Sequence, residues 1–166
     1  MLVLKEEVIH LTVKPILATL TIVKKDIPQS GLEYIYNNAE LYSIILRNDY
    51  SGSSIAFFTP DSFSQQLGYL PHKPGNVIKP HLHKLSRREV EYTHEVLFIK
   101  RGKVQVNFYD TSKAHIGSEV LNGGDVILLC GGGHGFKVLE ETVMIEVKQG
   151  PFMGLEDKER FEGVEK

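Results

Sequence analysis

Two histidines in the middle of the sequence are spaced for metal binding. His81 and His83 occur in the stretch GNVIKPHLH, which is predicted to form a β-strand over residues 77–84. Because alternate residues of a strand project from the same face, both imidazoles and Lys79 are expected on one side. Two imidazoles so placed can bind one cation side by side, so the pair indicates a metal site. Partly exposed strand histidines are the alternative interpretation.

Two further residues can complete such a site. Glu95 opens the apolar run VLFI, and a carboxylate buried there needs a compensating partner such as a metal ion. His134 follows three consecutive glycines, and its distance in sequence is no obstacle because the strands of a barrel bring remote segments together. Cys130 is the single cysteine, which excludes a thiolate zinc cluster within one chain. Histidine and carboxylate must therefore be the ligands.

The spacing of these residues resembles the two sequence motifs of the cupin superfamily. The first motif runs glycine, five residues, His-x-His, a loop, glutamate, six residues, glycine, and is matched by Gly75, His81, His83, Glu95 and Gly102. The second motif is matched at Gly123, Gly131 and His134. The resemblance covers residues 75–149. It implies an all-β, cupin-type double-stranded β-helix (a jelly-roll barrel) that holds one divalent transition metal, Fe, Mn, Zn or Ni, through His81, His83, Glu95 and His134.

The sequence departs from the second motif at two positions. Leu129 stands where the motif usually has proline, and Val138 stands where it often ends with asparagine. Neither position is a ligand in the family, so the metal assignment that the resemblance implies is unchanged.

The first motif has an enlarged gap between its histidines and its glutamate. Eleven residues, KLSRREVEYTH, separate His83 from Glu95, where the usual gap is much shorter. Either this loop is expanded at the mouth of the barrel, or Glu89 or Glu91 replaces Glu95 as the ligand. The spacing from Glu95 to Gly102 favours Glu95.

Other polar residues of this region are predicted to bind a substrate. Lys79 shares the predicted strand face with the two histidines. Arg87, Arg88 and Tyr92 lie in the expanded loop, where they can hold a carboxylate or phosphate by paired hydrogen bonds; a solvated loop is the alternative. His94 should face away from its neighbour Glu95 and is not predicted to be a ligand.

The fold that the resemblance implies does not select a reaction, so function must be inferred from the site. Three imidazoles and one carboxylate leave positions open on a six-coordinate metal for substrate, water or dioxygen. The first interpretation is a metal-dependent enzyme, such as a dioxygenase or isomerase, acting on a small polar or anionic metabolite. The alternatives are a metal-independent nucleotide-sugar epimerase or isomerase, with a histidine as base and Tyr92 as acid, and a non-catalytic small-ligand-binding module.

The elements that must position these residues are short strands separated by turns, a pattern typical of a sandwich or barrel. The clearest is the hairpin HEVLFIKRGKVQVNFYD, which turns at Gly102. Strands are predicted at residues 16–23, 34–36, 41–47, 55–59, 77–84, 91–100, 103–110, 115–121, 126–130, 135–139 and 143–148.

Length and composition set the remaining expectations. A chain of 166 residues predicts a single domain, with its core over about residues 75–149, N-terminal strands in residues 1–60 packing on the barrel and a charged, solvated tail in residues 151–166. The net charge of -2, without long blocks of one sign, argues against nucleic-acid binding. No segment resembles a signal peptide or reaches membrane-spanning length, so a cytoplasmic protein without membrane contact is expected.

A homodimer is also expected, from the alternation of the strand that follows Glu95. If Glu95 points inward, Leu97 and Ile99 are inside and Val96 and Phe98 lie on the outer face. Apolar residues on the outer face need a cover, which the N-terminal strands or a second copy of the chain can supply.

Overall fold

The computed structural model describes residues 23–26 and 31–163. Apart from one 3-10 turn, η1 (Gly154–Asp157), all regular structure in these residues is β-strand, and every strand pair is antiparallel. The protein is therefore all-β, as the sequence predicts. Among the described residues there is no helix long and apolar enough to span a membrane.

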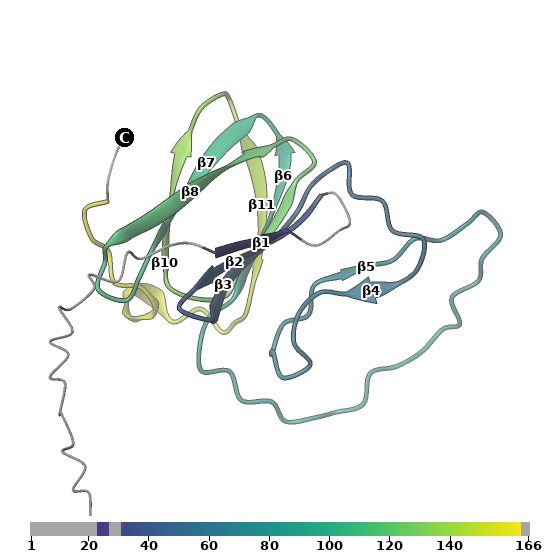
Figure 1. The fold of residues 1–166 in the computed structure, drawn as a ribbon. Helices are drawn as coiled ribbons and strands as arrows, with labels where there is room; N and C mark the ends of the chain where they lie inside the picture. Colours follow the sequence, from purple (N-terminus) through teal and green to yellow (C-terminus); the bar gives the residue numbers. More distant parts are fainter. Residues whose placement is uncertain (1–22, 27–30, 164–166) are drawn as a thin grey trace, which may run out of the picture.

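Two sheets form the body of the molecule (Figure 1). The larger sheet contains, in spatial order, β1 (Val23–Asp26), β2 (Leu32–Asn37), β3 (Glu40–Leu46), β9 (Val126–Leu129), β6 (Glu95–Arg101) and β11 (Val143–Lys148). The smaller sheet contains β10 (Gly133–Val138), β7 (Lys103–Tyr109) and β8 (His115–Asn122). A separate short pair is formed by β4 (Ala56–Phe57) and β5 (Gly68–Tyr69). β10 and β11 are thus edge strands of their sheets.

The main core lies between the two sheets. It joins residues of the larger sheet, such as Ile45, Ile99 and Ile127, to residues of the smaller sheet, such as Val106 and Leu121, and all five are fully buried. The opposite face of the larger sheet has a second core, which consists of Leu32, Ile44, Tyr50, Phe58, Leu67 and Leu128. Strands β3 and β9 are consequently buried on both faces, which their runs of apolar residues allow.

Strand β6 shows the alternation that the sequence predicts. Glu95, Leu97 and Ile99 are buried on the inner side, whereas Val96 packs against the second core and Phe98 is 38% exposed. The cover over Val96 comes from the segment that follows β3.

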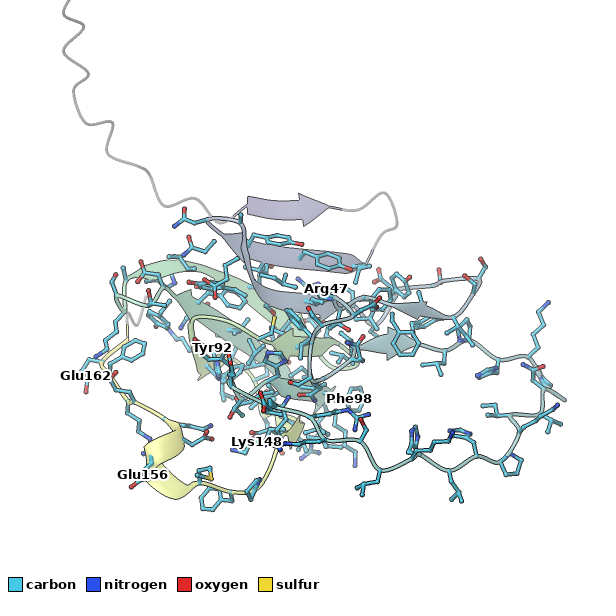
Figure 2. All side chains as sticks on the ribbon, turned by 90° about the horizontal axis from the view of Figure 1, so that it is seen from below. Arg47, Tyr92, Phe98, Lys148, Glu156 and Glu162 are labelled. Carbon is cyan, nitrogen blue, oxygen red and sulfur yellow. The ribbon has the colours of Figure 1, made fainter. Side chains whose placement is uncertain are left out.

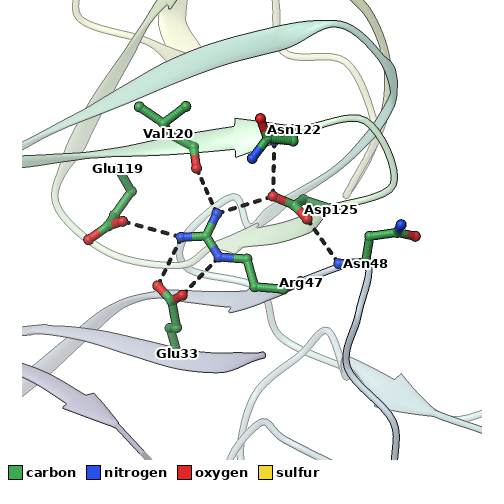
Figure 3. A network of polar contacts seen from close by, with 7 residues as sticks. All are labelled: Glu33, Arg47, Asn48, Glu119, Val120, Asn122 and Asp125. Atoms are coloured by element: carbon green, nitrogen blue, oxygen red, sulfur yellow. Dashed lines mark hydrogen bonds and ion pairs between the residues drawn. The ribbon is translucent and has the colours of Figure 1, made fainter. Parts of the chain in front are cut away.

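A partly buried arginine links the two sheets at one end (Figure 3). Arg47 directly follows β3, and its guanidinium donates to Glu33 of β2 at 2.8 and 3.0 Å. It also donates to Glu119 at 3.2 Å and to the Val120 carbonyl at 2.6 Å, both on β8, and to Asp125 at 3.1 Å in the turn before β9. The side chain of Arg47 is 18% exposed, so the arginine and its carboxylates are largely shielded from water.

Most predicted strands are present, with boundaries shifted by a few residues. The predicted hairpin at Gly102 is wrong, because β6 and β7 do not pair with each other: β6 belongs to the larger sheet and β7 to the smaller one. The predicted strand at residues 16–23 lies outside the described residues except for Val23, which begins β1. The predicted strand at residues 77–84 is wrong, because the structure has no regular structure there. Residues 70–93 instead form a long loop that runs out past β4 and β5 and returns to β6 (Figure 1).

Candidate functional site

Glu95 and His134 meet inside the protein, although they come from different sheets. Glu95 begins β6 and His134 is the second residue of β10. His134 Nε2 donates a hydrogen bond of 3.0 Å to Glu95 Oε2, and the Glu95 side chain is 8% exposed. Two of the four predicted ligands are therefore side by side.

The glycines before His134 are required by close packing. Gly132 has a φ of +59°, and a Cβ added there would lie 2.1 Å from the Tyr42 ring and 2.6 Å from the Tyr109 carbonyl oxygen. A residue with a side chain would push the turn away from β3 and β7. Close packing of this turn therefore fixes the chain just before His134.

A lysine that the sequence analysis missed completes the cluster. Lys158 Nζ lies 2.9 Å from Glu95 Oε1, so each carboxylate oxygen has one partner. The pKa of the Glu95 carboxyl is lowered to about 2, first by the hydrogen bond from His134 and further by Lys158, against the opposing effect of burial. Glu95 is therefore an anion at neutral pH, and its interaction with Lys158 raises the pKa of that lysine. No spacing rule connects Lys158 to the motifs.

The cluster lies in a pocket of about 1340 Å³ between the open ends of the sheets and the C-terminal segment. Its wall includes Asn107 and Tyr109 of β7, Phe136 of β10 and Met144 of β11. Cationic and anionic side chains both line it, among them Lys113, Lys137, Glu40 and Glu146. The pocket is large enough for a small polar metabolite.

His81 and His83 do not reach this pocket in the structure. Both lie in the long loop, where every residue from 72 to 92 is exposed. Their rings remain neighbours, 5.2 Å apart, and His81 Nδ1 lies 3.1 Å from the carbonyl oxygen of Lys79. Figure 2 shows the loop extending away from the strands, with its side chains in the open. No group of three His, Cys, Asp or Glu side chains among the described residues is arranged to hold a metal ion.

The predicted substrate residues are divided between the loop and the pocket. Lys79, Arg87 and Arg88 are exposed in the long loop and do not line the pocket. Tyr92 is 75% exposed but lies on the pocket rim. Of the long loop, only the last residues, Glu91, Tyr92 and Thr93, line the pocket.

The two alternative carboxylates also separate. Glu89 pairs with Arg87 at 3.8 Å in the exposed loop, whereas Glu91 lines the pocket. Neither replaces Glu95 beside His134, and the structure therefore brings together the pair that the motif spacing favours.

His94 and Cys130 are the two remaining residues that the sequence analysis singles out. His94 packs its ring 5.0 Å from Phe63, away from the pocket, and burial lowers its pKa. Cys130 lines the pocket but is largely buried, and burial raises the pKa of its thiol to about 12. A thiol with so high a pKa is not a nucleophile at neutral pH.

The side chains around Glu95 are suited to binding a cation. Glu95 offers anionic oxygens, His134 offers an imidazole at the same point, and Lys158 already places a positive charge there. A metal ion accepts these two donor types, and the pair matches half of the predicted ligand set.

Comparisons with models of known protein families, with curated proteins and with solved structures gave no match. The protein is an antiparallel all-β protein with two packed sheets.

Proposed function

We propose that this protein is a metal-binding cupin whose two sheets belong to a jelly-roll barrel and whose pocket binds a small polar or anionic metabolite. The observation that carries the proposal is the contact between Glu95 and His134. These two predicted ligands are 39 residues apart in sequence, and they meet in a pocket of about 1340 Å³. A metal bound there would polarise a substrate oxygen or activate water or dioxygen.

The proposal requires the long loop to move. Its apolar residues Val77, Leu82 and Leu85 are 83%, 95% and 105% exposed, which is unfavourable for side chains of this kind. β10 is an edge strand, and no described strand pairs with its outer edge. Extended residues 77–84 can add to that edge as a further strand, which would satisfy the backbone groups of both. His81 and His83 would then be carried toward His134.

The remaining protein groups would bind and orient the metabolite. Tyr92 and Thr93 on the rim and Lys113 and Lys137 in the wall offer donors to a carboxylate or phosphate. Lys79, Arg87 and Arg88 would join them if the loop adds to β10.

Measuring the metal content of the purified protein tests the proposed metal site. Protein purified without added metal should contain close to one divalent transition-metal ion per chain. Glu95→Gln and His134→Ala should lose it while circular dichroism still reports a folded β protein, and His81→Ala and His83→Ala should lose it if the loop supplies those ligands. His72→Ala is the matched control, because His72 lies in the same exposed loop outside the motif. A full complement of metal in Glu95→Gln would refute the site.

One observation favours a second function. The hydrogen bond from His134 to a buried carboxylate fixes the imidazole inside the pocket, an arrangement typical of general bases. A metal-independent epimerase or isomerase, with His134 as base and Tyr92 as acid, would use it. Turnover that survives complete removal of metal by a chelator would support this alternative, and ligand-induced stabilisation without any turnover would indicate a binding module.

A further inference from the structure

The C-terminal segment, residues 154–163, lies over the pocket that holds Glu95 and His134. Six of its residues line the pocket together with Lys158: Glu156, Asp157, Glu159, Arg160, Phe161 and Gly163. In Figure 2 this segment passes Glu156 and runs toward Glu162 along the outside of the strands. We call it the C-terminal cover.

Several contacts besides that of Lys158 hold the cover in place. Thr93 Oγ1 donates to Asp157 Oδ1 at 3.0 Å, and Lys113 Nζ pairs with Glu159 Oε1 at 2.5 Å. The Phe161 ring meets the Tyr109 ring edge-on, with centroids 5.1 Å apart. The cover is therefore attached to the rest of the protein through Asp157, Lys158, Glu159 and Phe161.

The attachment is of a kind that opens readily. Its ion pairs include side chains that are substantially exposed, 44% for Lys113 and 76% for Glu159, and such pairs contribute little to stability. The cover has no strand pairing, and η1 is its one regular turn. A short surface segment held in this way is a candidate for local opening.

Lys158 differs from the other contacts because it reaches the functional pair. Its ammonium group and His134 together occupy both oxygens of the buried Glu95 carboxylate. A second cation at Glu95 would be repelled by the ammonium group and would find one oxygen already taken. The two cations therefore exclude each other.

We propose that the C-terminal cover is a displaceable lid in which Lys158 acts as an internal occupant of the cation position at Glu95. Ligand cations bind there only when Lys158 leaves, and the cover opens as it does so. The identity of the cation as a divalent metal rests on the proposed function. The lid itself rests on the contacts of Lys158, Asp157, Glu159 and Phe161.

The first test compares the affinity of Zn²⁺ for the wild type and for Lys158→Met by isothermal titration calorimetry. Because an occupied site must open before Zn²⁺ can bind, removing the ammonium group should tighten binding about ten-fold or more. Lys100→Met is the matched control: it removes the same charge from an exposed position on β6, the strand that carries Glu95, and should leave the affinity unchanged. Equal Zn²⁺ affinity in the wild type and Lys158→Met would overturn the exclusion.

The second test needs no metal. Hydrogen–deuterium exchange of residues 154–163 should be about ten-fold faster in Lys158→Met and in Glu95→Gln than in the wild type, with strands β7 and β9 unchanged. Zn²⁺ should speed exchange of the same residues in the wild type. Unchanged exchange in both variants would overturn the lid.

The two proposals can fail separately. Absence of Zn²⁺ binding in the wild type and in Lys158→Met would refute the metal site, while the exchange of the two variants still decides whether Lys158 closes the cover. Zn²⁺ binding that is equally tight in both proteins, with slow exchange throughout, would keep the metal site and refute the lid.

Discussion

His94 and Glu95 are consecutive residues whose side chains point to opposite sides of the larger sheet. Glu95 points into the pocket toward His134, whereas His94 packs against Phe63 of the segment that covers the outer face. The His94 backbone is fixed as well, because its N–H donates to Gln149 Oε1 at 2.6 Å. The site carboxylate therefore stands next to a buried, uncharged imidazole.

The position of His94 predicts a loss of stability in acid. Burial lowers the pKa of His94 in the folded protein, so the unfolded chain binds its proton more readily. This contribution to the free energy of unfolding is complete above the unfolded pKa of about 6.5 and is lost as pH falls below it. Urea unfolding at about pH 7.5 and about pH 5.5 should therefore show a smaller pH effect in His94→Gln than in the wild type. His72→Gln, at an exposed position, should retain the wild-type pH effect.

Arg47 should be among the most sensitive positions outside the pocket. Arg47→Met removes the group that neutralises Glu33, Glu119 and Asp125, and the carboxylates left behind are poorly hydrated. The free energy of unfolding should fall by about 3 kcal/mol. Arg101→Met is the control, since its pair with Glu141 is exposed, and it should cost less than about 1 kcal/mol. A similar small loss for Arg47→Met in urea unfolding would show that the network does not link the sheets.

The turn before His134 should not tolerate a side chain at its centre. Gly132→Ala adds a methyl group against the Tyr42 ring and the Tyr109 carbonyl at a backbone angle that alanine disfavours, and should cost about 3 kcal/mol. In Gly135→Ala the new methyl group meets its nearest neighbour at 3.7 Å, so the protein should lose much less stability in thermal unfolding. Comparable losses for the two variants would contradict the close packing at Gly132.

The outer face of β6 and β11 should mediate the homodimer that the sequence predicts. Phe98 is 38% exposed there, and its register partner Ile145 is 48% exposed, so the two form an apolar surface next to an edge strand. Light scattering should find a dimer for the wild type and a folded monomer for Phe98→Asp. Val138→Asp, at an exposed apolar position on the other sheet, should remain dimeric. A monomeric wild type at high concentration would end this interpretation.

Local patterns sufficed to predict much of the fold. Strands β6 and β7 were predictable because two runs rich in β-branched and aromatic residues flank Gly102, where φ is +91°. Their pairing as a hairpin was not, because β6 pairs with β9 and β11 while β7 pairs with β8 and β10, so the chain passes from one sheet to the other at Gly102. The contact between Glu95 and His134 was predictable because the resemblance to the two cupin motifs implies that both belong to one site.

The rest depends on contacts that no local pattern encodes. Residues 77–84 alternate like a strand, yet a strand also needs a partner, and the structure gives this segment none. Lys158 lies 63 residues from Glu95 in a segment whose alternating charges resemble those of a solvated tail. Most of its neighbours are exposed as expected, and the single inward-reaching ammonium group has no signature in the sequence.

The pairing of β3 with β9 has a consequence for the order of folding during synthesis. Ser43 on β3 donates to the carbonyl of Leu128 on β9, 85 residues later, so the centre of the larger sheet joins an early strand to a late one. While the ribosome is still making the chain, β3 can pair with β2 alone, and its other edge stays open until residue 129 has emerged. Pairing across so long a separation is slow, and an open apolar edge invites association between nascent chains. Protection of β3 by a chaperone until translation is nearly complete would favour correct assembly.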